Sequence, residues 1–252
     1  MVEQAGTAEP ARREELRRGL ERVHERIGAA CRDSGRDPDE VRLVVVTKYF
    51  PASDVRALVE LGVGDVGENR DQEAATKVAE LDDLRDRLTV HFVGQLQSNK
   101  AGSVARYADV VHSVDRAKLV RALDRGAGRA GRQLEVLVQV DLRGAAGGSA
   151  GDGAGPGERG GVPLEAAADL AGAVAGSDHL LLRGVMAVAP LGGDPTAAFT
   201  RLREVAHGIR QSHPGATWVS AGMSGDLEAA VAQGATHLRV GSAILGSRPP
   251  LR

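Results

Sequence analysis

Aromatic residues and cysteine are both scarce in this chain of 252 residues. Phe, Trp and Tyr make up 2% of the sequence, so a core has to be built from aliphatic side chains, and base-stacking platforms for nucleic acid are not expected. The single cysteine, Cys31, cannot form an internal disulfide, which favours a free thiol in the cytoplasm. No apolar run reaches the roughly 18 residues of a membrane-spanning helix, and residues 1–5 lack the pattern of an export signal.

An excess of charge of either sign is also missing. The formal net charge is -2, so there is no electrostatic footprint for nucleic acid or for an anionic membrane, and we expect a small-molecule partner. A hydrophobic content of 42% over this length favours one large domain. We expect residues 1–10 to form a polar tail and residues 11–252 to form a single barrel domain.

Apolar residues first recur at a helical spacing. Over residues 11–32 they form one stripe, which predicts a helix that packs on the outside of the domain: Leu16, Leu20, Val23 and Ile27. Packing within one chain satisfies this stripe most simply, so we expect a monomer.

Strand and helix patterns then alternate to the end of the chain. We expect strands at 43–47, 65–67, 89–93, 109–112, 134–140, 181–188, 217–219 and 237–240, and helices at 53–61, 69–84, 98–107, 116–126, 164–175, 195–212, 226–233 and near 243. This order predicts an α/β protein, a (β/α)₈ TIM-type barrel with an extra N-terminal helix. A doubly wound open sheet is the alternative, but no G-x-G-x-x-G follows Val46.

One segment interrupts this alternation. Residues 144–161 are rich in Gly, Ala and Ser without periodicity, which predicts a flexible loop. Since the loop follows the fifth strand, it would emerge at the face where barrel active sites lie, either as a lid or as a tolerated surface insertion.

Lysine is rare as well, and one of the four lysines, Lys48, directly follows the apolar run at 43–47. A side chain at the carboxyl end of a buried strand faces the mouth of an α/β barrel. Lysine is also the residue that forms a Schiff base with an aldehyde. The alternative is an ordinary exposed lysine at the end of a strand.

The last two strands are followed by loops of small residues. Ser220 and Ser224 border the first of these loops, and Gly241 and Ser242 form the second. Backbone N–H groups and hydroxyls in such loops are the usual phosphate site of a barrel, although helix capping and tight turns would use the same residues. Because the first and eighth strands are neighbours in a closed barrel, a lysine facing this site indicates an aldehyde that carries a phosphate, which is pyridoxal 5′-phosphate (PLP).

Motifs across nearly the whole chain resemble those of the pyridoxal phosphate homeostasis protein family, which is similar to the barrel half of alanine racemase. They are Val46-Thr47-Lys48, Gly67-Glu68-Asn69, His91-Phe92-Val93-Gly94-Gln95-Leu96-Gln97-Ser98-Asn99-Lys100, Arg183-Gly184-Val185-Met186, Ala221-Gly222-Met223-Ser224-Gly225-Asp226 and Arg239-Val240-Gly241-Ser242.

This resemblance implies specific roles. Lys48 would form a covalent aldimine with PLP, and Arg239 would face the pyridine nitrogen and keep it unprotonated. Ser220, Ser224 and the backbone at Gly241 and Ser242 would hold the phosphate. The cofactor-binding residues implied in this way are Lys48, Asn69, Ser220, Met223, Ser224, Arg239, Gly241 and Ser242.

Two further positions bear on the resemblance. His91, like Asn69, would lie at the rim near the cofactor, or else it is a satisfied polar residue at the start of a strand. The family often has a second lysine two positions after the first, and this chain has Phe50 there, which argues against transfer through a second lysine.

The resemblance predicts a non-catalytic protein of PLP homeostasis that buffers the cofactor and delivers it to PLP-dependent apoenzymes. Racemases of this fold take their second base, a tyrosine, from an additional domain, and neither Tyr49 nor Tyr107 matches it. The alternatives are a weakly active racemase-like enzyme or Schiff-base aldolase that uses Lys48, and an adaptor in which bound PLP is structural.

Overall fold

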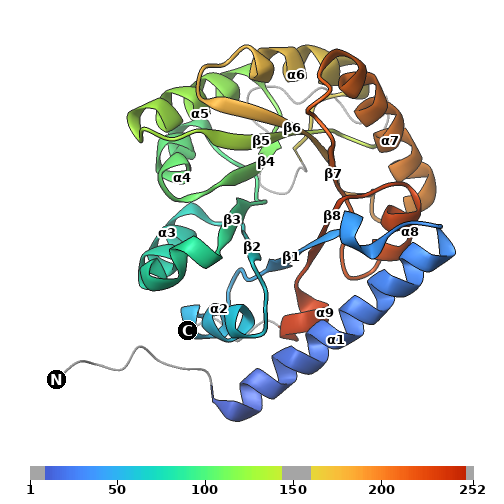
Figure 1. The fold of residues 1–252 in the computed structure, drawn as a ribbon. Coiled ribbons are helices and arrows are strands. Elements are labelled where there is room, and N and C mark those ends of the chain that lie inside the picture. The colour runs from blue at the N-terminus through green and yellow to red at the C-terminus, as the bar shows by residue number, and fades with distance from the viewer. Residues whose placement is uncertain (1–8, 144–159, 248–252) are drawn as a thin grey trace.

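The computed structural model describes residues 9–143 and 160–247. In these ranges eight parallel strands form a closed barrel in the order β1 to β8, and helices surround it (Figure 1). The predicted (β/α)₈ barrel of the α/β class is therefore confirmed. The strands are β1 (Arg42–Val46), β2 (Asp65–Glu68), β3 (Thr89–Phe92), β4 (Val110–Val114), β5 (Leu134–Gln139), β6 (Leu180–Met186), β7 (Trp218–Ser220) and β8 (His237–Val240).

The helices follow the strands as predicted, with small shifts at their ends. They are α1 (Pro10–Asp33), α2 (Ala52–Glu60), α3 (Asp71–Glu80), α4 (Ala101–Tyr107), α5 (Ala117–Arg129), α6 (Ala167–Ala175), α7 (Pro195–Ser212), α8 (Leu227–Ala232) and α9 (Ser242–Leu245). Four short 3₁₀ helices join them: η1 (Pro38–Glu40), η2 (Asp82–Arg87), η3 (Ser98–Lys100) and η4 (Leu164–Ala166). No helix among the described residues is both long enough and apolar enough to cross a membrane.

One predicted helix, over 69–84, is divided in the structure. The α-helix ends at Glu80, and η2 continues the segment. Leu81 lies between them with φ -109° and ψ 18°, outside the helical region, and its side chain is buried. The α-helix therefore ends at a core residue, where sequence periodicity alone predicts a continuous helix.

The extra N-terminal helix packs against the end of the chain. Helix α1 lies along α8 and α9 on the outside of the barrel (Figure 1). The predicted apolar stripe is fully buried, as its four residues show: Leu16, Leu20, Val23 and Ile27. A side-chain carbon at Gly19 would lie 2.5 Å from the backbone oxygen of Ile244, so only glycine allows α1 to approach α9 this closely.

The interior of the barrel has an apolar part and a polar part. Val110, Leu137 and Met186 form a small buried cluster, with Val188 and Trp218 packed against it. Buried polar side chains, among them His91, His112, Ser220 and Arg239, fill the rest, and the larger apolar core lies between the sheet and the helices. The predicted loop at 144–161 falls outside the described residues except for its last two positions, as do the first eight residues of the predicted tail.

Candidate functional site

Lys48 lies in the turn that follows β1, at the carboxyl end of the barrel. Its side chain is half-buried, and its amine nitrogen lies 5.8 Å from the ring centroid of Tyr49. Strand β1 pairs with β8, with Val44 opposite Arg239. Closure of the barrel therefore brings the turn of Lys48 next to the loop that follows β8.

A buried ion pair fixes the backbone just before Lys48. The amine of Lys77, on α3, lies 2.6 Å from Oε1 of Glu68 and donates a hydrogen bond of 2.9 Å to the backbone oxygen of Thr47. The hydroxyl of Thr47 donates to the same carboxylate at 2.7 Å. Lys77 and Glu68 are both buried, and burial raises the pKa of Glu68 against the opposing effect of Lys77.

The backbone just after Lys48 is held as well. The N–H of Tyr49 donates to Oε1 of Glu73, and this residue has φ 70°, the left-handed conformation that non-glycine residues rarely adopt. The guanidinium of Arg70 lies 4.9 Å from the Tyr49 ring centroid. The turn that presents Lys48 is thus strained and over-determined, which is common at binding sites.

The loops after β7 and β8 bring two hydroxyls together. The hydroxyl of Ser242 donates to that of Ser224 at 3.3 Å. A side-chain carbon at Gly241 would lie 3.0 Å from the backbone oxygen of Val46, so this loop lies directly against the end of β1. Met223 is partly exposed beside it, and its N–H donates to Asp226 at 2.6 Å. The predicted phosphate residues after β7 and β8 are therefore adjacent to each other and to β1.

Arg239 is a buried cation inside the barrel. It is 5% exposed, its Nη1 donates to the hydroxyl of Ser220 at 2.6 Å, and its Nη2 donates to the backbone oxygen of Ala187 at 2.8 Å. No carboxylate among the described residues lies within ion-pair distance of it. Burial lowers the pKa of Arg239 to about 10, which is still far above neutral pH, so the group stays charged.

A buried cation without an ion-pair partner is costly unless an acceptor meets it. Arg239 keeps N–H donors beyond the two that it uses, because a guanidinium has five. The site is therefore suited to a ligand with a polar acceptor directed into the barrel.

Asn69 lies where β2 ends, as the predicted rim position requires. Its Oδ1 is buried and has no hydrogen-bond partner among the described residues. A side-chain carbon at Gly94 would lie 2.3 Å from the backbone oxygen of Asn69, so the loop after β3 packs tightly on it. Asn69 thus offers an unsatisfied polar atom near the mouth.

Inside the barrel, Ser220 and His91 belong to one hydrogen-bonded group. Nδ1 of His112 lies 2.9 Å from the Ser220 hydroxyl, Nε2 of His112 lies 2.9 Å from Nδ1 of His91, and Nε2 of His91 lies 2.8 Å from Oδ1 of Asp65. His91 is therefore a satisfied interior residue and not a rim residue. Sequence analysis missed Asp65 and His112. Strand parity groups the side chains that share a face of one strand, but it does not say which face points into the barrel.

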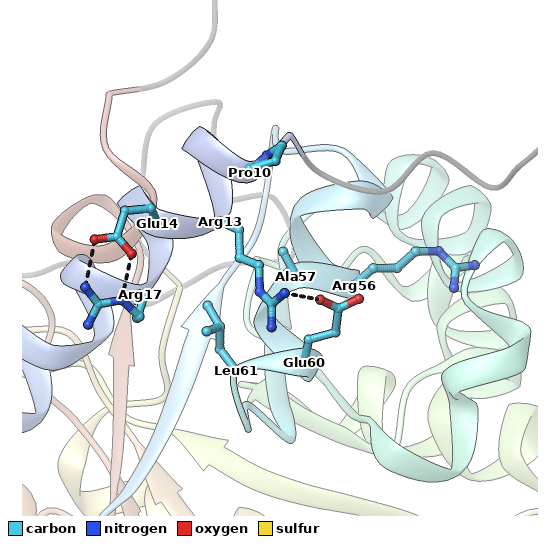
Figure 2. Close-up of a pocket in the computed structure, with 8 residues that line it drawn as sticks. All are labelled: Pro10, Arg13, Glu14, Arg17, Arg56, Ala57, Glu60 and Leu61. Atoms are coloured by element: carbon cyan, nitrogen blue, oxygen red, sulfur yellow. Dashed lines mark hydrogen bonds and ion pairs between the residues drawn. The ribbon is translucent and has the colours of Figure 1, made fainter.

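The described residues also include a surface groove between α1 and α2, away from the barrel mouth (Figure 2). Its basic residues are already paired: Arg13 lies 3.5 Å from Glu60, and Arg17 lies 2.7 Å from Glu14. Arg56 is paired with Asp83 at 2.6 Å. Cations neutralised in this way leave little charge for an anionic ligand, so we place the site at the mouth. No cluster of potential metal ligands occurs in the described part of the chain.

Comparisons with known proteins agree with this barrel. A family model described as the alanine racemase N-terminal domain matches residues 26–249. The pyridoxal phosphate homeostasis protein of Mycobacterium tuberculosis (strain ATCC 25618 / H37Rv) is 42% identical, with 96% of each chain covered. The protein of the same name from Escherichia coli (strain K12) is 33% identical, with 93% of this chain and 97% of the relative covered.

A solved structure of a similar protein has the same fold. The structure of PipY from Synechococcus elongatus PCC7942 with PLP bound has a TM-score of 0.74 at 35% identity, and the match covers 89% of this chain and 100% of that chain. The chain belongs to the family of pyridoxal phosphate homeostasis proteins. The resemblance found in the sequence motifs is thereby confirmed.

Proposed function

We propose that this protein binds PLP at the carboxyl end of the barrel and serves PLP homeostasis without catalysing a reaction. The observation that carries the proposal is the buried Arg239, which has no ion-pair partner among the described residues, on the strand next to the one that presents Lys48. The PLP-bound structure of PipY and the names of the relatives support it.

The residues at the mouth fit each part of the cofactor. The amine of Lys48 would hold the aldehyde, and Arg239 would direct a donor at the ring nitrogen. The hydroxyls of Ser224 and Ser242 and the backbone at Gly241 hold the phosphate, because they are small, polar and adjacent. When bound, PLP supplies an electrophilic aldehyde and an aromatic ring that can accept electrons.

Three other residues surround this arrangement. We assign the unpartnered Oδ1 of Asn69 to polar contact at the rim, and the partly exposed side chain of Met223 to covering the phosphate loop. Ser220 was predicted to be a phosphate contact, but its hydroxyl lies between Arg239 and His112. We therefore assign it to orienting Arg239.

The charge of Arg239 favours binding over catalysis. A guanidinium does not give its proton to the pyridine nitrogen, so the ring remains a weak electron sink. A racemase also needs a second base. Tyr107 is buried on α4, where burial raises its pKa, and Tyr49 packs against Arg70. Neither tyrosine is placed for that role.

In this role the protein holds a reactive aldehyde reversibly and releases it to PLP-dependent apoenzymes. Reversible attachment at one lysine limits the damage that a free aldehyde does to other amines. We propose that it acts as a monomer in the cytoplasm, because the apolar stripe of α1 is satisfied within the chain and Cys31 is buried as a free thiol.

The test is spectroscopic and chemical. The purified protein is incubated with PLP, its absorbance is recorded, and the adduct is reduced with borohydride and mapped by peptide analysis. We expect a new visible band and a label on Lys48, with both lost in Lys48→Ala and retained in Lys118→Ala, which changes an exposed lysine on α5. A label spread over Lys77, Lys100 and Lys118, or no band at all, contradicts the proposal.

A racemase-like enzyme is the second candidate, and the match to the alanine racemase N-terminal domain favours it. It predicts turnover of D- or L-alanine by the PLP-loaded protein that Lys48→Ala abolishes. Binding without turnover supports homeostasis.

A further inference from the structure

A continuous chain of polar side chains crosses the barrel interior and ends at Arg239. It joins Asp65, His91, His112, Ser220 and Arg239 through contacts of 2.8, 2.9, 2.9 and 2.6 Å. These residues come from β2, β3, β4, β7 and β8, so the chain connects strands on different sides of the barrel (Figure 1). Asp65 opens the chain at the first position of β2, at the amino end of the barrel.

The direction of every hydrogen bond in the chain follows from Asp65 when both histidines are neutral. An ionised carboxylate can only accept, so His91 donates to it from Nε2 and accepts at Nδ1. His112 then donates to His91 from Nε2, and its own Nδ1 accepts the hydrogen of the Ser220 hydroxyl. The Ser220 oxygen in turn accepts from the guanidinium of Arg239.

All four contacts of the chain have a donor and an acceptor in this arrangement, with both histidines neutral. The chain has a cation at one end and a carboxylate at the other, so its bond dipoles all run the same way. Burial, the nearby His91 and the charge of Arg239 hold the pKa of His112 well below its usual range. Burial alone would raise the pKa of Asp65, but the hydrogen bond from His91 and the charge of Arg42 leave it lowered.

Part of the barrel interior is filled without polar groups. The apolar cluster of Val110, Leu137 and Met186 fills part of the same interior with aliphatic side chains. A buried polar chain is stable only if every member is satisfied, and it has one function that an apolar filling cannot provide, which is to orient a charged group. Arg239 is held at both terminal nitrogens, by Ser220 and by the backbone of Ala187.

We propose that the Asp65–His91–His112–Ser220 chain is a positioning device that fixes the orientation of Arg239 toward the ring of the bound cofactor from the opposite end of the barrel. This inference rests on the proposed function, since it gives Arg239 the ring nitrogen as its ligand. The chain acts through Arg239 and does not touch the cofactor.

The first test needs no cofactor. Nitrogen-15 NMR of histidine-labelled, full-length protein at pH 7 reports which ring nitrogen carries the hydrogen. We expect neutral His91 and His112, each with its hydrogen on Nε2. A hydrogen on Nδ1 of either ring, or a charged ring, overturns the chain as described.

The second test uses PLP and two matched variants. His112→Phe keeps an aromatic ring but removes both nitrogens, whereas Met186→Leu is a volume-conserving change in the apolar part of the same interior. In His112→Phe we expect PLP still to attach to Lys48, with a shifted absorbance maximum and dissociation about tenfold faster, as for loss of a hydrogen bond to a charged group. Met186→Leu should match the wild type.

Two variants of Ser220, Ser220→Thr and Ser220→Ala, separate the effect of its hydroxyl on the orientation of Arg239 from its effect on packing. The threonine keeps the hydroxyl and should restore the wild-type absorbance maximum, whereas the alanine should behave like His112→Phe. An unchanged spectrum and dissociation rate in both His112→Phe and Ser220→Ala overturn the inference while leaving PLP binding intact. If wild-type protein shows the expected tautomers but never takes up PLP, the proposed function fails, and the role of the chain toward the cofactor fails with it.

Discussion

The amine of Lys77 lies 2.9 Å from the backbone oxygen of Thr47, the residue immediately before Lys48. The same amine is paired with the buried carboxylate of Glu68. This buried ion pair therefore holds the backbone at the start of the turn that carries Lys48. The turn that carries Lys48, the lysine proposed to hold PLP, is thus held by a second lysine that is buried in an ion pair.

Removal of the Lys77 cation should destabilise the protein strongly. In Lys77→Met, Glu68 remains buried without its partner, which costs about 3–5 kcal/mol in the free energy of unfolding. The control is Lys100→Met, because Lys100 is 41% exposed and 3.8 Å from Asp71, and such surface pairs contribute about 0–1 kcal/mol. Urea denaturation followed by circular dichroism measures both. Equal midpoints for the two variants would contradict this account of the ion pair.

A negative charge at the phosphate loop should select against the phosphate alone. In Ser242→Asp the new carboxylate lies beside Ser224, and we expect PLP binding to weaken by at least about a hundredfold, while binding of pyridoxal, which has no phosphate, is retained. Ser212→Asp, an exposed change at the end of α7, serves as the control. Absorbance titrations with both aldehydes give the affinities. If PLP and pyridoxal were weakened equally, the phosphate would not lie beside Ser242, which contradicts the proposed site.

The packing of α1 against α9 should be sensitive to a single methyl group. In Gly19→Ala the new carbon would lie 2.5 Å from the backbone oxygen of Ile244, so one helix must shift, at a cost of about 1–3 kcal/mol. Since α9 begins at Ser242, PLP should also dissociate faster.

The matched control for Gly19→Ala is Gly28→Ala in the same helix. Its new methyl group would meet only a flexible arginine nitrogen at 3.4 Å, and alanine favours the helix by about 0.5–1 kcal/mol. Thermal unfolding of both variants should therefore give changes of opposite sign. A stabilised Gly19→Ala protein would show that the approach of α1 to α9 is not tight.

Stability should fall on mild acidification because of the buried histidines. Burial lowers the pKa of His237 to about 3 and that of His112 well below its usual value. In the unfolded chain both protonate near pH 6.5, so the unfolded state binds more protons below that pH and the free energy of unfolding decreases. At pH 5 the loss should be about 2 kcal/mol for each histidine.

Urea denaturation at pH 7 and pH 5 measures this difference. His237→Gln should reduce the pH dependence by about half, because it removes one of the two titrating rings while keeping a polar side chain. A pH dependence identical to that of the wild type would assign the effect to other groups.

The fold could be predicted from the sequence because each strand and helix has its own local pattern. The closeness of Ser224, Gly241 and Ser242 could be predicted for the same reason, since they lie in two short segments at corresponding positions of the last two units. The place of Lys48 just after β1 could be predicted because an apolar run ends directly before it. These signals all lie in short stretches of sequence. The order of the strands in a closed barrel then places these stretches next to one another.

The interior chain could not be predicted, because it depends on which face of each strand points inward. Every residue of β4 (Val110–Val114) is buried, so this strand shows no alternation of apolar and polar residues that would mark its interior face. Ser220 illustrates the same limit. It was grouped with Ser224 as part of one loop, but it is the last residue of β7 and its hydroxyl lies inside the barrel, whereas Ser224 lies beyond the strand.

Because β1 pairs with β8, the candidate site is assembled only after the last strand has been synthesised. Lys48 belongs to the first βα unit, and Ser242 to the last. If Lys48 and Ser242 hold PLP as proposed, a growing chain that has made only the early units has the amine without the phosphate loop and would not retain the cofactor during synthesis. Once the last strand has docked, a bound ligand favours the closed form by mass action. Cofactor occupancy would then report on completed folding.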